Sequence, residues 1–471
     1  MHGFEEFASA PDTNHDDKTP WYKLLNRYHW FVLIVAALGW LFDTMDQQLF
    51  ALARKPAMVE LLTTNGVAPD GPTVGYWGGI VTSIFLIGWA TGGLFFGMLG
   101  DRIGRAKVML WTILIYSFCT GLSALSVGFW DFAFYRFLTG LGVGGEFAVG
   151  VSLVAEVMPH KARPFALGLL QALSAVGNIS AALINMWLGV LEGQGAFSGL
   201  EMGGEPVKAW RIMFVIGTVP ALLAILIRRN LKEPETWQKV AHDGTVSKQL
   251  GSFQELLGDP RWRKNALAGL ALAFAGVVGL WGIGFFSYDL FDSVLQKKFK
   301  GEGFSEADIA AKKAFWIGLT SVMQNIGGFL GIYAFSYVTH YTGRKPAFAI
   351  SFVAATLSTA LVFSSLDQIS EIFWMIPLMG FCQLALFGGY AIYFPELFPT
   401  RLRSTGTSFC YNVGRFAAAA GPMTLGALMK FAFQGYAEPM RYAGVTMCGI
   451  FLLGLVALPF APETKGQPLP E

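Results

Sequence analysis

Twelve long apolar runs restrict this chain to very few folds. The runs span 19 to 30 residues, and roughly 18 to 25 apolar residues are enough for a helix to cross a hydrocarbon layer of about 30 Å. Inside such a layer every backbone polar group must be satisfied within the protein, so we expect each run to be a helix. The runs lie at 28–50, 76–99, 106–127, 130–157, 163–190, 210–228, 265–291, 312–338, 346–364, 371–396, 402–431 and 440–461.

The composition supports a membrane protein. Hydrophobic residues make up 54% of the chain and charged residues 14%, whereas soluble domains carry about 25% charged residues. The net charge of +2 is too small to favour a nucleic-acid partner. All four cysteines fall inside apolar runs, so we expect buried thiols rather than disulfides or metal ligands. Residues 1–27 lack the basic segment of a cleaved signal peptide, so we expect this tail to be retained.

A short charged joint between two apolar runs occurs twice in the chain. Glu156-Val-Met-Pro159-His-Lys161-Ala-Arg163 returns in the second half as Glu396-Leu-Phe-Pro399-Thr-Arg401-Leu-Arg403. A second pair consists of Gly104-Arg105-Ala-Lys107 and Gly343-Arg344-Lys345-Pro346. Repeated joints of this kind indicate two related sets of six helices, which is the layout of a secondary transporter.

The duplication predicts a division of the chain into two halves with polar connections. Within the central connection, Ser252-Phe-Gln-Glu-Leu-Leu has the pattern of a short amphipathic helix lying on the membrane face. The expected segments are an N-terminal tail at 1–27, a six-helix half at 28–228, a central loop at 229–264, a second six-helix half at 265–461 and a C-terminal tail at 462–471.

Basic residues predict how the chain is oriented, because they concentrate in cytoplasmic loops. The joints after runs three, nine and eleven hold few basic residues. The joint after run seven is an exception, since Lys297, Lys298 and Lys300 occur there beside three acids. We therefore expect an inner (plasma) membrane protein with both termini and the even-numbered joints in the cytoplasm. The basic residues of those joints include Arg102, Arg105, Lys107, His160, Lys161, Arg163, Arg344, Lys345, Arg401 and Arg403.

Several motifs resemble those of the major facilitator superfamily over essentially the whole chain. Gly97-Met-Leu-Gly100-Asp101-Arg102-Ile-Gly104-Arg105-Ala-Lys107 resembles its loop motif between the second and third helices. Arg136-Phe-Leu-Thr-Gly140-Leu-Gly142-Val-Gly144-Gly145-Glu146 resembles its fourth-helix motif. Pro234-Glu235-Thr236 and Pro462-Glu463-Thr464-Lys465-Gly466 resemble the paired motifs of the sugar-porter branch and its organic-ion relatives. The resemblance implies an all-α membrane protein of twelve transmembrane helices in two pseudo-symmetric halves, working by alternating access.

Within that superfamily the first half is most similar to bacterial metabolite:proton symporters. This group includes carriers of aromatic acids, sialate and small carboxylates, and the similarity lies in Phe42-Asp43-Thr-Met-Asp46 and in the glycine-rich stretch that ends at Glu146. The second half departs from the pattern, because His340-Tyr-Thr-Gly343-Arg344 lacks the Asp-Arg pair of the first copy. Fewer charges would then hold the gate on that side.

The charged joints are expected to form a cytoplasmic gate. One exposed ion pair contributes only about 0–1 kcal/mol, so a network is needed to bias the two conformations. The alternative is that these charges only set the topology, although that role does not require carboxylates. The expected gate residues are Asp101, Arg102, Arg105, Glu156 and Arg163 in the first half and Arg344, Glu396 and Arg403 in the second.

Charges inside the apolar runs indicate the transport site, because each is costly in a membrane and usually faces a cavity or a partner. Asp43 and Asp46 are three residues apart and share one helix face. Two neighbouring carboxylates repel when both are charged, which suits a site that binds and releases a proton. Glu146 is a third candidate, and Arg136 can point the same way. The alternative is that one of these acids only neutralises Arg136.

Arg415 is the expected anchor of the substrate. It lies deep in run eleven without an acid in the same run, and a guanidinium can hold a carboxylate through two hydrogen bonds. In the organic-anion carriers that the chain resembles, an arginine of this helix is associated with anionic substrates. The alternative is a structural pairing with Asp289 or a backbone carbonyl. Further candidate ligands, each of which could instead join two helices, are Gln171, Asn178, Gln324, Asn325, Gln383, Asn412 and Tyr288. Tyr288, Trp281, Phe387 and Tyr390 are expected as possible aromatic walls of the site.

The expected function is proton-coupled uptake of a small organic anion, a carboxylate, by a monomer with no cofactor besides the coupling proton. The alternative is a sugar or polyol carrier, either a proton symporter or a facilitator, and a non-transporting membrane receptor is a third class. We expect no enzyme, because the sequence shows no phosphate-binding loop, metal-ligand spacing or nucleophile–base set. The glycines Gly140, Gly142, Gly144 and Gly145 are expected to serve close helix packing rather than substrate binding.

Overall fold

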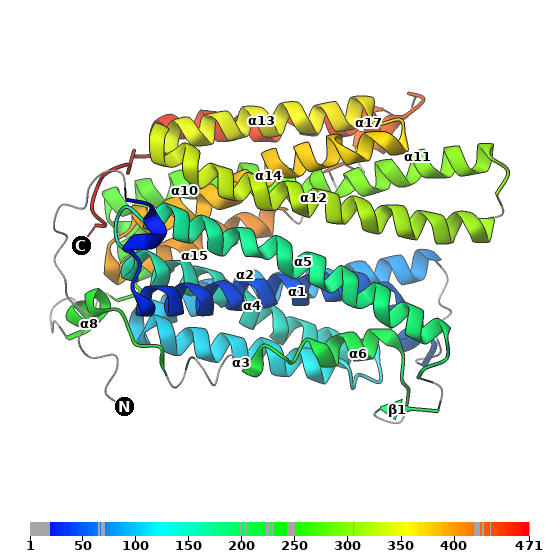
Figure 1. Ribbon diagram of the computed structural model, residues 1–471, viewed down its shortest axis with the longest axis horizontal. Helices are drawn as coiled ribbons and strands as arrows, with labels where there is room; N and C mark the ends of the chain where they lie inside the picture. The colour runs from blue at the N-terminus through cyan, green and yellow to red at the C-terminus, as the bar shows by residue number, and fades with distance from the viewer. Residues whose placement is uncertain are drawn as a thin grey trace.

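The computed structural model is an elongated bundle of helices (Figure 1). The chain near Trp21 and the C-terminal residues lie at the same end of this bundle. We call this end, which also carries the Gly104 and Gly343 joints, the joint end, and the opposite end the far end. The structure describes residues 19–64, 66, 71–197, 199–202, 205–222, 227, 230–242, 250–304, 306–418, 424–425, 428–433 and 435–470.

The first half is built from long helices with short connections. A 3-10 turn, η1 (Trp21–Leu24), precedes the first helix. A two-residue antiparallel pair near the far end, β1 (Glu201–Met202) with β2 (Glu205–Pro206), sets Glu201 opposite Pro206. The helices are α1 (Arg27–Thr64), α2 (Gly71–Ile103), α3 (Arg105–Ser123), α4 (Phe129–Val157), α5 (Arg163–Gly193) and α6 (Ala209–Ile216).

The second half repeats this plan with more interruptions. Two short helices of the central segment precede it, α8 (Glu235–His242) and α9 (Phe253–Gly258). Its α-helices are α10 (Pro260–Gly282), α11 (Ser287–Gly301), α12 (Glu306–Thr342), α13 (Arg344–Ser365), α14 (Met375–Tyr393), α15 (Arg403–Ala418), α17 (Pro439–Met447) and α18 (Gly449–Ala457). Shorter 3-10 and π turns are η3 (Gly284–Phe286), η4 (Ile369–Phe373), η5 (Phe394–Leu397), η6 (Thr400–Leu402), η7 (Leu428–Ala432) and η8 (Leu458–Phe460).

Ten segments within the described residues are long and apolar enough to cross a membrane. They correspond to predicted runs one to five, seven to ten and twelve, so the protein is a multi-pass membrane protein. Runs six and eleven include residues outside the described part of the chain, and α6 and α15 are the portions of them that the structure describes. Three basic residues in and beside the central connection, Arg228, Arg229 and Lys248, also lie outside the described residues.

Helix boundaries are the part of the prediction that needs correction. Helix α1 continues to Thr64, well past the end predicted at position 50, because the polar residues that follow the apolar run still favour a helix. Run seven is two helices, because the chain leaves helical geometry at Ile283 between two glycines. The lysines expected in the loop after that run therefore lie on α11. The short helix expected at Ser252 is confirmed as α9, with the Ser252 hydroxyl capping the Glu255 N–H.

Glycines in α4 allow close contact with its neighbours. A Cβ atom on Gly142 would stand 2.8 Å from the Tyr116 nitrogen of α3. A Cβ atom on Gly140 or Gly144 would collide with the backbone of α2. Real Cβ atoms do not approach other atoms so closely, so these positions require glycine for helix packing, as the sequence predicts. The two halves meet where α2 packs on α15 and α5 packs on α12.

The duplicated glycine-arginine joints have one structural cause. Gly104 and Gly343 have positive φ angles of 115° and 97°, a conformation that favours glycine. Each precedes a helix in which a glutamate from far along the chain caps two N–H groups of the first turn. Glu233 accepts from Ala106 and Lys107, both at 3.1 Å, and Glu463 accepts from Arg344 at 2.9 Å and Lys345 at 3.0 Å.

The cap at Glu463 changes the chemistry of its carboxyl group. Partial burial would raise the pKa of Glu463, but hydrogen bonds from four backbone N–H groups outweigh it and lower the pKa below its ordinary value. The ionised form therefore stabilises the fold at pH values above 4.5, and this contribution is lost as the pH falls further.

Replacing Glu463 with glutamine removes the charge that holds the start of α13. Loss of such a cap costs about 1 kcal/mol, so Glu463→Gln should lower the melting temperature by about 2–4 °C near pH 7. The difference from the unaltered protein should shrink as the pH falls below 4.5, because the native carboxyl then becomes protonated as well. Thermal unfolding in detergent at several pH values measures both effects.

Glu233 and Glu235 provide the matched comparison. Glu233→Gln should behave like Glu463→Gln, because Glu233 caps α3 in the same way. Glu235→Gln should have little effect, because Glu235 is exposed in the first turn of α8. Equal losses for all three variants would contradict the capping role.

Candidate functional site

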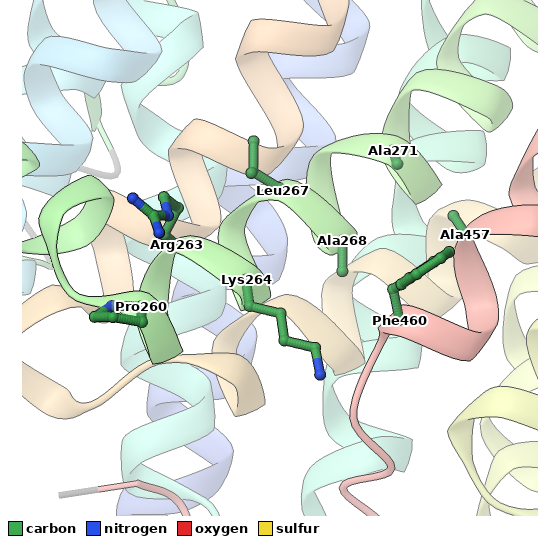
Figure 2. Close-up of a pocket in the computed structure, with 8 residues that line it drawn as sticks. All are labelled: Pro260, Arg263, Lys264, Leu267, Ala268, Ala271, Ala457 and Phe460. Carbon is green, nitrogen blue, oxygen red and sulfur yellow. The ribbon is translucent and has the colours of Figure 1, made fainter.

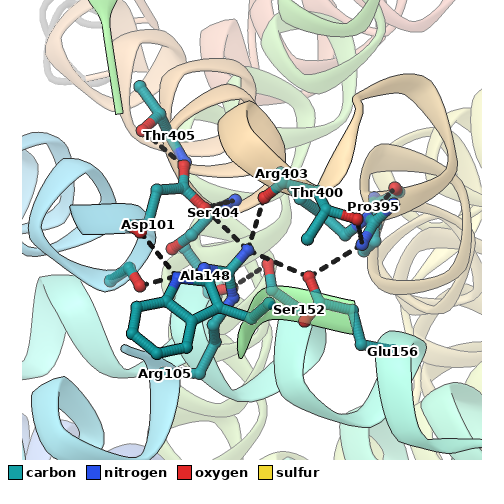
Figure 3. A network of polar contacts seen from close by, with 12 residues as sticks. Asp101, Arg105, Ala148, Ser152, Glu156, Pro395, Thr400, Arg403, Ser404 and Thr405 are labelled. Atoms are coloured by element: carbon teal, nitrogen blue, oxygen red, sulfur yellow. Dashed lines mark hydrogen bonds and ion pairs between the residues drawn. The ribbon is translucent and has the colours of Figure 1, made fainter. Parts of the chain in front are cut away.

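The first part of the candidate site is a contact between the halves at the joint end. The carboxylate of Asp101, at the end of α2, accepts hydrogen bonds from the backbone N–H groups of Ser404 at 3.1 Å and Thr405 at 2.8 Å (Figure 3). It also accepts one from the Thr405 hydroxyl at 2.7 Å. N–H groups in the first turn of a helix have no partner within the helix, and they attract negative charge. Asp101 therefore caps a helix of the opposite half.

Arg105 holds this carboxylate in place and adds a second link between the halves. Its guanidinium lies 2.9 Å from Asp101 and 3.0 Å from Glu156. It also donates to the Thr400 carbonyl of the second half at 2.5 Å. Asp101 and Arg105 are both completely buried. Trp237 of α8 covers them, and its indole donates to the Asp101 carbonyl at 2.7 Å.

The arginine of the second joint crosses to the first half. We expected Arg403 to join Arg344 and Glu396, but it lies 2.7 Å from Glu156. The second half keeps its own pair, with Arg344 2.7 Å from Glu396. The reason is geometric: Arg403 opens α15, which packs against α2 and α4 of the first half. The two halves therefore share one carboxylate, Glu156, between Arg105 and Arg403.

Two other predicted gate residues have different surroundings. Arg163, which we expected beside Glu156, lies within electrostatic range of both Glu156 and Glu396, so it also faces the second half. Arg102 donates to the Leu250 carbonyl of the central segment at 3.2 Å, so it ties that segment to α2. Arg102 therefore lies at the edge of the ion-pair network.

The second half replaces the Asp101 cap with an aromatic contact. His340 occupies the position in the second joint that corresponds to Asp101. Its ring lies 5.2 Å from the ring of Phe165, near the start of α5 in the first half. The ring of Tyr337 also packs on Phe165, at 4.9 Å. The two joints therefore close with unlike chemistry, one through a buried carboxylate and one through rings.

Polar contacts between the halves occur only over part of their length. Among the described residues they extend from the joint end to the hydrogen bond of Asn178 with Asn325 at 2.9 Å, near the middle of α5 and α12. The Ser408 hydroxyl also donates to the Gly93 carbonyl between α15 and α2. The joint end of the structure is therefore closed.

The second part of the site is a group of buried charges in the first half. The Arg136 guanidinium lies 3.6 Å from Asp46, which also accepts a hydrogen bond from Thr120 at 2.7 Å. Arg136 donates to Ser123 at 2.7 Å and faces the ring of Phe214 at 4.6 Å. Asp46 and Arg136 are both completely buried. Asp46 therefore neutralises Arg136, which is the alternative role that the sequence left open for one of these acids.

Asp43 and Glu146 lie beside this pair and differ from it. Both are almost completely buried, at 0% and 1% exposure. They interact with each other electrostatically. Among the described residues, none of their four carboxylate oxygens has a hydrogen bond of good geometry. Glu146 reaches α1 over Gly39, where a Cβ atom would collide with it. The structure thus brings the carboxyl groups of Asp43 and Glu146 together. The nearby Arg136 pairs with Asp46 instead of with either of them.

The third part of the site is Arg415, which lies where the halves meet. Its guanidinium stacks 3.6 Å from the Trp89 ring of α2 and 4.4 Å from the ring of Tyr411. It is 6% exposed. Its Nε and Nη1 atoms have no hydrogen-bond acceptor among the described residues. The side chain of Asp289, an alternative partner, lies outside the described part of the structure.

Most of the predicted amide ligands join helices in this conformation. Tyr288 donates to Gln324 and Gln383 donates to Thr359 at 2.6 Å, each between two helices. Asn412 instead donates to Ser408 of its own helix, α15, at 3.0 Å. Asn325 accepts from Asn178 across the halves. Gln171 is buried, and its Oε1 atom has no donor among the described residues.

Aromatic rings surround Arg415, and the sequence indicated only some of them. Trp89 lies 6.3 Å from Trp281, and Phe387 lies 6.2 Å from Tyr411. Trp281 and Phe387 were expected as possible walls, but Trp89 was missed, because nothing distinguishes it from other aromatic residues of run two. The sequence of a single helix does not predict which residues of the other half it contacts.

The chain resembles known transporters along its length. A family model described as "Sugar (and other) transporter" matches residues 44–261. A putative metabolite transport protein of Haemophilus influenzae is 29% identical, over 94% of this chain and 99% of its own. A cis,cis-muconate transport protein of Acinetobacter baylyi is 28% identical, over 79% and 83%. The solved proton:xylose symporter XylE has a TM-score of 0.72 at 17% identity, covering 94% of this chain and 98% of its own.

The chain is therefore similar in sequence to transporters, and its fold is the two-half arrangement of the major facilitator superfamily. The family model, the relatives and the solved structures that match this chain are all of transporters rather than enzymes.

Removing the charge of Asp101 should open the joint end. Asp101→Asn weakens the cap on α15 and leaves Arg105 with one carboxylate fewer. Breaking a buried pair from one side costs about 3–5 kcal/mol, which is enough to change the balance of two conformations. Spin labels on Lys107→Cys and Tyr341→Cys, at exposed joint-end positions of opposite halves, should show longer distances in this variant.

Asp131→Asn is the matched control. Asp131 caps the start of α4 within the first half, with bonds of 2.8 and 2.9 Å to the N–H groups of Val127 and Gly128. It should leave the label distances unchanged. If Asp101→Asn also leaves them unchanged, the contact at the start of α15 does not control the closed state.

Proposed function

We propose that the protein is a proton-coupled symporter that takes up a small organic anion, a carboxylate, by alternating access. The observation that carries the proposal is the guanidinium of Arg415, which is buried between the halves with two nitrogens lacking acceptors among the described residues. We further propose an inner-membrane location with the joint end and both termini in the cytoplasm, from the basic residues of the joints.

An anion is the ligand that best satisfies Arg415. A buried cation without a carboxylate is costly, and a guanidinium can bind a carboxylate through two parallel hydrogen bonds. Trp89 and Tyr411 already fix the plane of the guanidinium, so little freedom is lost on binding. The muconate carrier of Acinetobacter baylyi supports this class of substrate, since its named substrate is the anion of a carboxylic acid.

Asp43 and Glu146 are the proposed proton site. Two ionised carboxylates side by side in a buried place repel strongly, so the pair favours holding a proton. Asp46 is less suited, because Arg136 stabilises its ionised form. We therefore assign proton exchange to Asp43 and Glu146, and assign the Asp46–Arg136 pair to their electrostatic support.

Coupling then follows from where these groups lie. Glu146 is on α4 and Asp43 on α1 of the first half, whereas Arg415 is on α15 of the second half and touches α2. An anion bound at Arg415 and a proton on the Asp43–Glu146 pair both reduce unpaired buried charge. The loaded protein can therefore change conformation at lower electrostatic cost than the half-loaded one.

Sugar transport is the second candidate, favoured by the family description and by the fold of the xylose symporter. Transport assays in proteoliposomes distinguish the two candidates. An inward proton gradient should drive accumulation of a carboxylate from a panel that includes cis,cis-muconate. Accumulation of xylose, with no carboxylate of the panel accumulated, would favour the sugar carrier.

Arg415→Ala should weaken carboxylate binding about 100-fold, the value expected for two charge-assisted hydrogen bonds. Arg415→Lys should recover only part of the affinity, because an ammonium group cannot make the planar pair of bonds. Calorimetric titration of the purified protein with the transported carboxylate measures both. Arg261→Ala is the control, since Arg261 stacks on Trp262 at the joint end. Unchanged affinity in Arg415→Ala would contradict the anchor role.

Asp43→Asn and Glu146→Gln should abolish accumulation driven by a proton gradient. Exchange of labelled for unlabelled carboxylate across the membrane should continue, because it needs no net movement of protons. Asp46→Asn should behave differently: it leaves Arg136 buried without its acid and should lower the melting temperature. Retained accumulation in both Asp43→Asn and Glu146→Gln would place the coupling proton elsewhere.

A further inference from the structure

A groove on the outside of the second half lies apart from the transport site. It runs between the start of α10 and the last turns of α18 and η8 at the joint end (Figure 2). Its volume is about 400 Å³. The lining residues are Pro260, Arg263, Lys264, Leu267, Ala268, Ala271, Ala457 and Phe460.

Small side chains form the floor of this groove and large apolar ones its walls. Ala268 and Ala457 are buried, at 5% and 7% exposure, where α10 meets α18. Leu267 and Phe460 are exposed, at 52% and 63%. In a protein that crosses a membrane, such exposed apolar residues face lipid. The slot therefore suits a hydrocarbon chain.

Two cations stand at the end of the slot. Arg263 and Lys264 are exposed in the first turns of α10, and neither has an ion pair or a side-chain hydrogen bond with another described residue. Figure 2 shows the Lys264 side chain extending along the groove toward Phe460.

The acids near these cations already have other partners. Asp259 accepts from the N–H groups of Arg261 and Trp262 at 2.8 and 3.3 Å. Glu255 pairs with Arg401 at 2.8 Å. The positive charge of Arg263 and Lys264 is therefore available to a ligand from outside the protein.

We propose that this groove binds an anionic phospholipid, with its phosphate on Arg263 and Lys264 and one acyl chain along Leu267, Ala271 and Phe460. Basic pockets between helices at a membrane face hold acidic headgroups in this way. Along α10 the two cations come first, and the apolar lining residues Leu267, Ala268 and Ala271 follow, so a phosphate at the cations can continue into an acyl chain on the apolar lining. A soluble anion such as phosphate would use the cations alone and leave the slot empty. The proposal requires a membrane protein but not the substrate or the proton site proposed above.

Titration of the delipidated protein in detergent tests this site, with bound lipid counted by native mass spectrometry. Phosphatidylglycerol should bind more tightly than phosphatidylcholine with the same acyl chains. The double variant Arg263→Gln, Lys264→Gln should weaken phosphatidylglycerol binding about 10-fold and leave phosphatidylcholine binding unchanged. Arg261→Gln, which removes a neighbouring cation that stacks on Trp262, should retain full binding.

Ala271→Leu provides a second variant that leaves the charges in place. It should weaken phosphatidylglycerol binding by filling the slot. An unchanged preference for phosphatidylglycerol in both variants would overturn the proposal. The proposal would also be overturned if millimolar inorganic phosphate displaced bound phosphatidylglycerol as effectively as added phosphatidylglycerol does. The apolar slot would then contribute nothing to binding.

Discussion

The carboxylate of Asp101 binds the first turn of a helix that belongs to the other half of the molecule. A helix start offers N–H groups that must find acceptors, and at α15 the acceptor comes from α2. Arg105 and Glu156 then neutralise the carboxylate and link it to Arg403. Because all these groups are buried, no member can leave without stranding the charge of another. The closed joint end is therefore made or broken as one unit.

Buried charge organises the rest of the molecule as well. The pair of Asp46 with Arg136 is complete in itself, whereas Asp43, Glu146 and Arg415 lack such partners among the described residues. A protein that only needed stability would replace those three with apolar side chains. Their presence in a bundle that is otherwise packed closely, with glycines at helix contacts, fits the transport cycle proposed above, in which ligands supply the missing partners.

The sequence was sufficient for the helices, the duplication and the residues that carry charge. Run length predicts a membrane helix because the bilayer sets it, and a carboxylate inside a run is conspicuous wherever it points. Pairing was harder to predict. Arg403 was expected beside Glu396 of its own half and lies on Glu156 of the other, because symmetry within one sequence says nothing about how two halves dock. Trp89 was missed, and Asp46 and Asp43 were not distinguished, for the same reason: each depends on a neighbouring helix.

The capping glutamates also change where the two repeated units end. The boundaries drawn from hydropathy fall at 228 and 461, just after the last apolar run of each half. Glu233 and Glu463 lie beyond those boundaries, yet each closes the third helix of its own half at Gly104 or Gly343. Each repeated unit thus consists of six helices together with the segment after them that carries the capping glutamate. A truncated or fused version of this protein would need to keep the chain through Lys465, whose N–H also binds Glu463.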